Sequence, residues 1–407
     1  MRTRFTWVVA ILSLVAVGAL LACSTKYSAS SNGLIVVSTF TGDAVMDSFS
    51  LNLGNGSVAR INNVNGPPTP GAATAVVLDP AGAHAYVIVN KNSAIAQSVT
   101  GITSYSIASD GKLALVGTTA LKDAVVPVAE VMDSAGKLLF VAGESGTVSV
   151  LSIGSGGTLT EVAGSPFALP AEGGGQSPVA SALAVTPTVF PTLGTQNSPC
   201  SGFTAPTTEN LYVTDSINNV VLNYSVSPAG ALKLVPATTL TPGVATGTVP
   251  SGVTVDPCGR FVYVSNQSPN NSVSAYTICN AVSLPKCPDA NYSLQPVGSP
   301  TTVGDLPGPL LVNPLGQFLY VLATGASEVS MFRISSSDGS LTALNPPSAS
   351  VNSAPMSMAI RSDAQWLFVA NLNSANVSQF AITPATGALT PLPAITTDNL
   401  PWGVAVK

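Results

Sequence analysis

A short turn followed by an aromatic strand recurs along this chain and constrains its fold more than any other feature. The turn has Asp or Asn first, Pro second and Gly fourth, the order that a type I turn prefers. Copies begin at Asp79, Asp133, Asp256 and Asn313, with an interrupted copy at Thr186 and a degraded one at Arg361. In chain order the intervals are 54, 53, 70, 57 and 48 residues, a spacing typical of propeller blades.

Each copy predicts four antiparallel strands, which we call a, b, c and d. Strand a precedes the turn and the aromatic strand b follows it. Strand c alternates apolar and polar positions, and a Gly turn such as Gly157 or Gly230 introduces strand d. Alternation with period two marks strands whose faces differ in environment. We expect the aromatic of strand b to wedge between neighbouring blades.

The two ends of the chain supply different strands of one blade. Residues 401–406 match strand a, whereas residues 34–37, 45–51 and 58–62 match strands b, c and d. A ring that did not close would leave an exposed sheet edge. The sequence therefore predicts an all-β, seven-bladed propeller over residues 33–407, closed by the C-terminal strand.

Composition agrees with this fold and excludes one class of partner. Only 8% of the residues are charged, 46% are hydrophobic, and the net charge is −5. Nucleic-acid binding needs clustered Lys and Arg, and no such cluster is present.

The first residues resemble a bacterial lipoprotein signal. Arg2 and Arg4 precede an apolar run, which ends at Ala22 before Cys23. The resemblance implies a signal peptide over residues 1–22, lipidation of Cys23, and a tether over residues 23–32. An ordinary secretory signal with an incidental Cys is the alternative. Ser24 after the Cys is similar to the outer-membrane class, so we expect a lipid-anchored protein of the cell envelope.

Four further cysteines are compatible with two disulfides in an oxidising compartment. Three connectivities are possible. The blade pattern places Cys200, Cys258, Cys279 and Cys287 on one face and favours Cys200–Cys258 between blades and Cys279–Cys287 within a loop.

Residues 211–215, 262–266 and 367–371 look like the YVTN-type repeat. The whole unit resembles the lactonase-like seven-bladed propeller family, which includes the propeller type of 6-phosphogluconolactonase. The resemblance implies lactone hydrolysis, an Arg-His pair at the start of an inner strand, and a Glu after the Tyr-Val-x-Asn stretch. No Arg-His pair occurs at the inner-strand starts, but Glu144 stands at the position of the family's Glu.

Three residues are candidates for chemistry. Glu144 is either the family's catalytic carboxylate or a solvated loop acid. Glu130 replaces the apolar residue of strand a, so its carboxylate is expected to project into the channel, where it is either functional or simply hydrated. His84 is expected to make a surface or interblade polar contact.

The face that carries the b–c and d–a loops is expected to hold the ligand. Its predicted ionisable residues are Asp43, Lys91, Lys122, Asp123, Glu144, Glu172, Asp215, Asp305 and Asp398. Seven acids against two bases disfavour a phosphosugar, which this face would repel. The glycine stretches 154–157 and 173–175 do not open helices, so they predict no phosphate loop. We expect no cofactor and no metal.

Two functions remain open. The first is a binding or scaffold module whose loop face engages a glycan, a peptide or an envelope protein. The second is a lactonase that acts on a non-phosphorylated lactone. Scarcity of titratable groups and the missing Arg-His pair outweigh the family resemblance, so we expect the binding or scaffold module, with the lactonase as the alternative.

Overall fold

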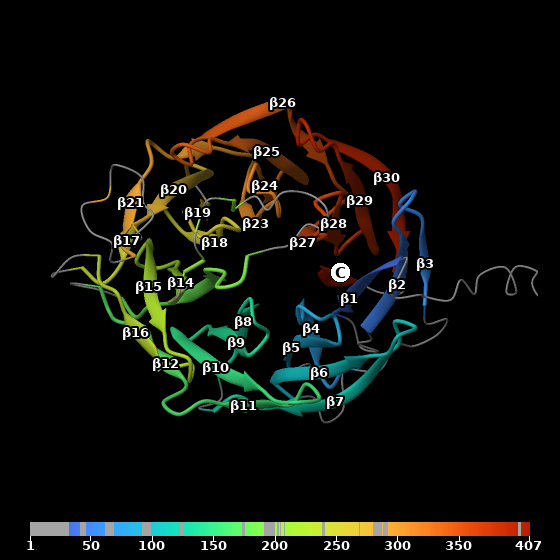
Figure 1. Ribbon diagram of the computed structural model, residues 1–407, viewed down its shortest axis with the longest axis horizontal. Coiled ribbons are helices and arrows are strands. Elements are labelled where there is room, and N and C mark those ends of the chain that lie inside the picture. The colour runs from blue at the N-terminus through green and yellow to red at the C-terminus, as the bar shows by residue number, and fades with distance from the viewer. Residues whose placement is uncertain are drawn as a thin grey trace, which may run out of the picture.

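The computed structural model is a ring of β-sheets whose inner strands surround a central axis (Figure 1). It describes residues 32–407 apart from 41–45, 62–68, 92–98, 123–124, 173–175, 191–199, 202, 204, 207, 238–240, 268, 280–286, 288–291 and 398–399. The proposed signal peptide, Cys23 and nearly all of the tether therefore lie outside the described residues. None of the residues described forms a helix that is both long and apolar enough to cross a membrane.

Seven sheets form the ring, each with strand a innermost, as predicted. Blade 1 combines β31 (Pro401–Val406), β1 (Asn32–Thr39), β2 (Met46–Asn52) and β3 (Val58–Arg60). Blade 2 is β4 (Ala72–Leu78), β5 (His84–Asn90), β6 (Gly101–Ile107) and β7 (Leu113–Thr119). Blade 3 is β8 (Pro127–Met132), β9 (Leu138–Gly143), β10 (Thr147–Ile153), β11 (Leu159–Glu161) and β12 (Phe167–Ala168).

The remaining blades follow the same order. Blade 4 is β13 (Ala180–Val185), β14 (Glu209–Asp215), β15 (Val220–Val226), β16 (Leu232–Leu234) and β17 (Val244–Ala245). Blade 5 is β18 (Pro250–Val255), β19 (Phe261–Asn266), β20 (Ser272–Ile278), β21 (Leu294–Pro296) and β22 (Thr301–Thr302). Blade 6 is β23 (Pro307–Val312), β24 (Phe318–Ala323), β25 (Glu328–Ile334) and β26 (Leu341–Ser350), and blade 7 is β27 (Pro355–Ile360), β28 (Trp366–Asn371), β29 (Asn376–Ile382) and β30 (Leu389–Thr396).

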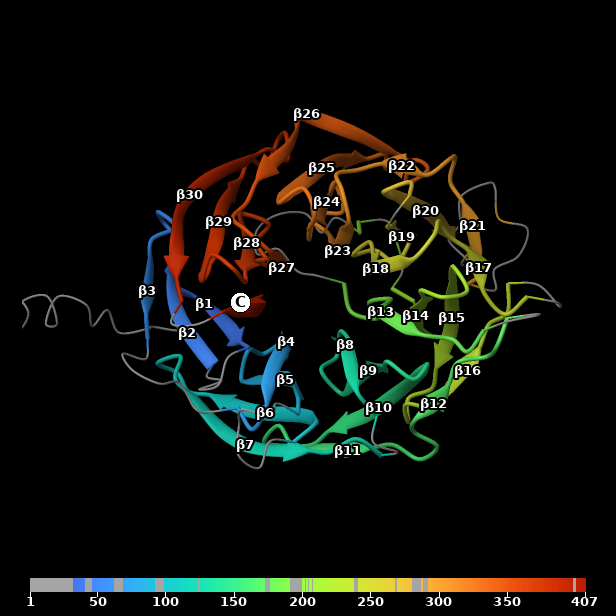
Figure 2. The same cartoon turned by 180° about the vertical axis from the view of Figure 1, so that it is seen from behind.

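The ring closes through the predicted pairing of the two ends. β31 pairs with β1 in antiparallel register, with Val406 opposite Ile35 and Val404 opposite Val37. The blue start and the red end of the chain consequently meet in one blade (Figure 2). Gly403 is required there, because a Cβ atom would lie 2.6 Å from the Ser38 hydroxyl oxygen.

In blades 3, 4 and 5 the outer strand differs from the single strand d that we predicted. It is divided into two short pieces that both pair with strand c. Gly164 and Pro166 stand at the break in blade 3, and Gly298 and Pro300 at the break in blade 5. Proline has no N–H to donate to the ladder, which interrupts the strand at these points.

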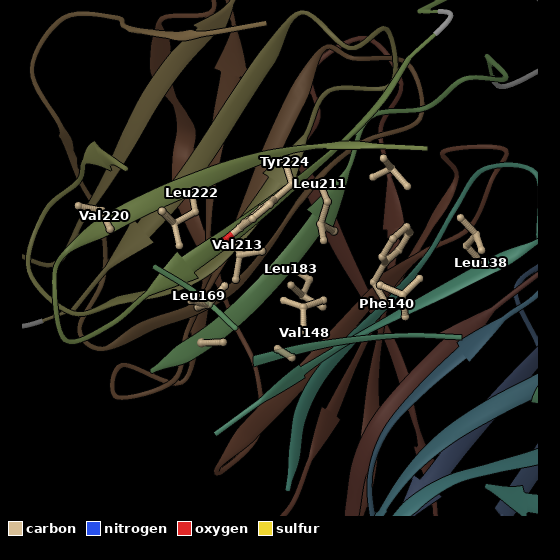
Figure 3. Close-up of a cluster of buried hydrophobic side chains, with 14 residues drawn as sticks. Leu138, Phe140, Val148, Leu169, Leu183, Leu211, Val213, Val220, Leu222 and Tyr224 are labelled. Carbon is tan, nitrogen blue, oxygen red and sulfur yellow. The ribbon is translucent and has the colours of Figure 1, made fainter. Parts of the chain in front are cut away.

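The hydrophobic core lies between the blades rather than in one centre. Figure 3 shows one such layer, where Phe140 and Val148 of blade 3 face Leu183, Leu211 and further side chains of blade 4. Because both sides of each sheet are covered in this way, most b strands are buried along their whole length and the c strands along most of theirs.

The aromatic residues of strand b do wedge between blades, as predicted. Tyr263 donates from its hydroxyl to the Gly339 carbonyl of the next blade at 2.9 Å, and Tyr320 donates to the Gly387 carbonyl at 2.8 Å. Both glycines have positive φ, and a Cβ atom on Gly339 would lie 2.5 Å from the Phe261 ring. The Gly turn before strand d is thus needed for conformation and for space.

Candidate functional site

The two faces of the ring are built differently. We call the face with the a–b turns the cap face, because Asp79, Asp133, Asp256 and Asn313 cap those turns. For example, Oδ1 of Asn313 accepts from the backbone N–H groups of Gln317 and Phe318 at 2.8 and 2.9 Å. We call the opposite face, which carries the b–c turns, the mouth face.

Every inner strand begins at the mouth face with a β-bulge. The pairing of strand a with strand b slips at the same place in all seven blades. The residues at the slip are Thr74, Val128, Ser181, Ser251, Gly308, Met356 and Trp402. A bulge redirects side chains, so these positions surround the start of the channel.

A second set of residues stands beside the bulges, one place past the end of each strand b. These residues are Phe40, Lys91, Glu144, Ser216, Gln267, Thr324 and Leu372. In most blades their N–H donates to the carbonyl of the residue that precedes strand a, as Glu144 does to Val126 at 3.0 Å and Gln267 to Val249 at 3.1 Å. We call the two sets together the channel mouth.

The ionisable residues at the channel mouth are Lys91 and Glu144. They belong to neighbouring blades, 2 and 3, and both are exposed. The Glu144 carboxylate and the Lys91 ammonium make no hydrogen bond or ion pair with another described residue. A carboxylate and an ammonium group are therefore available to a ligand at the junction of blades 2 and 3.

The other predicted ionisable residues of this face are engaged elsewhere. Asp215 is fully buried and accepts from the Asn218 side chain at 2.7 Å, which holds the b–c turn. Glu172 accepts from the Gly243 N–H at 2.8 Å, and Asp305 accepts from the Asn271 amide at 2.9 Å. Lys122 pairs with Glu161 at 3.4 Å. Asp43, Asp123 and Asp398 lie outside the described residues.

Glu130 does not project into the channel, which corrects our expectation. Both carboxylate oxygens are inaccessible to solvent, and neither has a hydrogen-bond partner among the described residues. The backbone at Ile88 of the preceding blade approaches the carboxylate without reaching hydrogen-bond geometry, which offsets only a little of the cost of burial. Burial therefore raises the pKa of Glu130 well above its ordinary value.

The reason is the packing of strand a. At the position of Glu130 the other blades carry apolar residues such as Val253, Leu310 and Met358, which are buried in the layers between blades. Glu130 occupies the same kind of position: the residue is half-buried, and its two carboxylate oxygens are out of reach of solvent. A ligand in the channel would therefore not reach its carboxylate.

Asparagines of the repeat have a structural role. The Asn266 side chain donates to Ser274 Oγ at 3.0 Å and accepts from the Gly247 N–H at 3.0 Å. Asn371 donates to Ser378 Oγ at 2.9 Å. The last residue of the Tyr-Val-x-Asn stretch thus ties strand c and the interblade connection to strand b.

The cap face contains the predicted cysteine pairs and the histidine. Cys200 is bonded to Cys258 and Cys279 to Cys287, which confirms the pairing expected from the blade pattern. Two disulfides indicate that the protein matures in an oxidising, exported environment. His84 Nδ1 lies 2.8 Å from Asp79 Oδ2 in the same blade, and its ring packs against Gly157 of blade 3, so its polar contact lies within the blade and its interblade contact is one of packing.

A groove of about 400 Å³ lies elsewhere, at the seam between blades 7 and 1. Arg60 and Gln379 are among its lining residues. Arg60 is bonded to the buried Asp47 at 2.5 Å and lies over the Phe49 ring, and Gln379 donates to the Gly56 carbonyl. Its polar groups are already used in closing the ring.

Residues 34–181, 201–345 and 291–404 match the model of the family described as lactonase, 7-bladed β-propeller. The chain belongs to this family. Among curated proteins, none matches the chain in sequence.

Solved structures share the fold at low identity. One is a protein of Bacteroides fragilis proposed to be a 6-phosphogluconolactonase, with a TM-score of 0.70 and 17% identity, covering 93% of this chain and 98% of that one. Another is the periplasmic gluconolactonase of Pseudomonas aeruginosa, with a TM-score of 0.69 and 19% identity, covering 92% and 99%. At such identities the likeness shows the fold alone.

Three features of the site were not predicted from the sequence. The unpaired state of Lys91, the burial of Glu130 and the apolar residues that precede the inner strands all emerged from the structure. The apolar residues before the inner strands could have been found in the sequence, because Val126, Val249 and Leu306 each stand before a proline that begins strand a.

Proposed function

We propose that this protein hydrolyses a non-phosphorylated lactone at the channel mouth. The observation that carries the proposal is the pair of unpartnered, exposed side chains, Lys91 and Glu144, on adjacent blades of a lactonase-family propeller. Glu144 also stands at the family's Glu position, although the Arg-His pair is missing.

The chemistry assigns one role to each group. The Glu144 carboxylate takes a proton from water, and the resulting hydroxide attacks the lactone carbonyl carbon. The Lys91 ammonium stabilises the oxyanion that forms. The ring C–O bond then breaks, the leaving alkoxide takes the proton back from Glu144, and the product is a hydroxy acid.

Charge supports a substrate without phosphate. Among the described basic residues, the mouth face has Lys91 and Lys122, and Lys122 forms an ion pair with Glu161. The acids Glu144, Glu172 and Asp305 face the same solvent. A doubly charged phosphate would be repelled rather than attracted.

A binding or scaffold role is the second candidate. It is favoured by the exposed apolar side chains of the mouth face and by the hydrogen bonds that already engage most of its carboxylates. The ligand would be a glycan, a peptide or an envelope protein held without turnover.

The test is hydrolysis of a lactone panel by the full chain carrying Cys23→Ser, with spontaneous hydrolysis subtracted. Glu144→Gln should reduce kcat/KM by about 100-fold, and Lys91→Met by about tenfold or more. Asp305→Asn, a second exposed carboxylate of the same face, is the matched control and should change little. Equal turnover by wild type and Glu144→Gln would contradict the assignment, and no turnover at all would favour the binding role.

We also infer export and attachment to the membrane through Cys23. β1 begins at Asn32, on the cap face, so a tether from Cys23 would turn the channel mouth away from the lipid surface. Cys23→Ser should move the protein from the membrane to the soluble fraction. An unchanged distribution would leave only a secretory signal.

A further inference from the structure

An apolar collar surrounds the channel mouth. The residue two places before the bulge of strand a is apolar in every blade; the seven are Ala72, the first residue of β4, and Val126, Val179, Val249, Leu306, Ala354 and Leu400, which directly precede strand a. Val126, Val249 and Leu306 are exposed by 43, 42 and 39%. Val128, at the bulge of blade 3, is 42% exposed. We call the seven residues together with Val128 the collar.

Apolar exposure is concentrated on this face. Six of the nine large hydrophobic residues exposed in the described part of the chain lie on it: Val99, Val126, Val128, Ile217, Val249 and Leu306. The other three are Leu115 and Val116 on the outer strand β7 and Val189 in the a–b insertion. Scattered exposed side chains need no explanation, but a set that gathers around one opening indicates a binding surface.

The backbone holds part of the collar in a strained conformation. Val249, Leu306 and Ala354 have φ values of 51°, 48° and 54°. This left-handed region is costly for a β-branched or bulky residue, and Gly or Asn would occupy it more easily. The Asn219 side chain accepts from the Val249 N–H at 2.7 Å, and Asn271 accepts from the Leu306 N–H at 3.2 Å.

Val249 and Leu306 therefore stand at positions where the backbone conformation favours Gly or Asn, and the protein carries large apolar side chains there at a cost in strain. Strain of this kind concentrates at functional sites. The carbonyl of Val126 accepts from the Glu144 N–H at 3.0 Å, so the collar adjoins the proposed catalytic carboxylate. Trp402 stacks on Phe40 at 4.9 Å at the same mouth and adds a further apolar surface.

We propose that the collar binds the hydrocarbon chain of an alkyl-substituted lactone, whose ring lies at Lys91 and Glu144. The inference rests on the proposed function and names the substrate class of that site. Such a ligand is uncharged. Its alkyl end is apolar, and its lactone ring is the one part that needs polar contacts from the protein. A sugar lactone would place hydroxyl groups against the exposed apolar side chains of Val126, Val128, Val249 and Leu306, which cannot hydrogen-bond to them.

The experiment compares γ-butyrolactone, γ-decalactone and glucono-1,5-lactone as substrates of the full chain carrying Cys23→Ser. We expect kcat/KM to rise at least about tenfold from γ-butyrolactone to γ-decalactone, since each methylene that leaves water contributes up to about fourfold. Glucono-1,5-lactone should be the poorest of the three. No preference for the longer chain, or a preference for glucono-1,5-lactone, would overturn the proposal.

The matched variants are Val249→Asn with Leu306→Asn, and Leu115→Asn. Asn tolerates the left-handed conformation, so the collar double variant should fold. It should lower the ratio of kcat/KM for γ-decalactone over γ-butyrolactone by about fivefold or more. Leu115→Asn removes a more exposed apolar side chain from β7 and should leave that ratio unchanged. Equal ratios in the double variant and in wild type would contradict a role for the collar.

A binding measurement separates this inference from the proposed function. If wild type hydrolyses no lactone, the proposed reaction fails, and quenching of tryptophan fluorescence by γ-decalactone and γ-butyrolactone is titrated instead. Tighter binding of the longer chain, lost in the collar double variant, would support the collar alone. Binding that is independent of chain length would overturn it. Hydrolysis with no dependence on chain length would retain the catalytic pair and reject the collar.

Discussion

Charged residues have different surroundings on the cap face and at the channel mouth. On the cap face they are paired: His84 with Asp79 at 2.8 Å, Arg260 with Asp256 at 2.9 Å, and Arg361 with Asp363. At the channel mouth the side chains of Lys91 and Glu144 have no partner among the described residues, and the same face exposes apolar side chains such as Val126 and Val128. The cap face uses charge to hold turns, whereas the mouth leaves its charge available to a ligand.

The difference follows from what each face must do. The a–b turns join the inner strand to the aromatic strand that packs between blades, so an error there would disturb two layers of core. The structural contribution of the channel mouth is the backbone hydrogen bond between the residue past strand b and the residue before strand a. In the described part of the chain, its side chains join no layers of core. Substitutions should therefore affect stability at the cap face and ligand chemistry at the mouth.

The largest effect on stability should come from the disulfide that links blades 4 and 5 on the cap face. Cys200→Ser with Cys258→Ser opens a loop with a sequence separation of 58, worth about 4 kcal/mol in the free energy of unfolding. The pair Cys279→Ser with Cys287→Ser, with a separation of 8, is the control and should cost about 2 kcal/mol. Denaturant unfolding measures both. Equal losses would argue against the chain-entropy account.

The next largest loss in the free energy of unfolding is expected at the turn cap of blade 5. Asp256 is fully buried, accepts from the Phe261 N–H at 2.9 Å, and pairs with Arg260. Asp256→Ala removes the cap and leaves a guanidinium without its partner, which should cost about 3 kcal/mol.

Asn313 provides an internal control for that substitution. It caps the turn of blade 6 with an amide, so Asp256→Asn should keep the cap and lose only the ion pair. Asn313→Ala removes a cap that has no ion pair. If Asp256→Asn were as destabilising as Asp256→Ala, the ion pair rather than the cap would account for the loss.

Asp133, which caps the turn of blade 3, has no cation paired with it among the described residues but lies near the carboxyl group of Glu209. This pair of acids should make the stability of the protein depend on pH. Glu209 is buried near Asp133, and burial together with that negative charge raises the pKa of Glu209 to about 8. The folded state then keeps a proton that the unfolded chain releases above about pH 4.5, so stability should fall as pH rises from about 5 to 8. Glu209→Gln should remove this slope and add about 2 kcal/mol at pH 8. A slope that survives the substitution would assign it to another group.

The smallest effect on stability is expected at the mouth. Glu144→Gln and Lys91→Met remove exposed side chains without partners, so each should change the free energy of unfolding by less than about 0.5 kcal/mol. These are the variants that should abolish most turnover. A large loss of stability in either would show that the mouth has the structural duty that we assign to the cap face.

Much of the fold could be predicted because its elements repeat. The turns at Asp79, Asp133 and Asp256 give the blade period, and the period assigns residues 401–406 to the first blade. Once the blades are numbered, each cysteine falls on a known face and in a known loop. The same numbering places Glu144 and Lys91 past the ends of neighbouring b strands.

Which ionisable and exposed side chains meet across blades could not be predicted in this way. Whether Glu130 faces the channel or Ile88 of the preceding blade depends on the bulge and on how two sheets pack. The proximity of Glu209 to Asp133 joins two blades and has no local sequence signal. The backbone N–H groups of Val249 and Leu306 donate to the side chains of Asn219 and Asn271 of the preceding blade, and the exposure of the two apolar residues depends on these bonds.

By itself, the sequence determined the ring, its closure, its disulfides and the face on which Lys91 and Glu144 stand, because these depend on local turns and on a regular period. Only the tertiary structure decided which charges are paired, which acid is buried and which apolar residues remain in solvent. Those outcomes depend on side chains that meet across blades, far apart in the chain, and a repeat period carries no information about them.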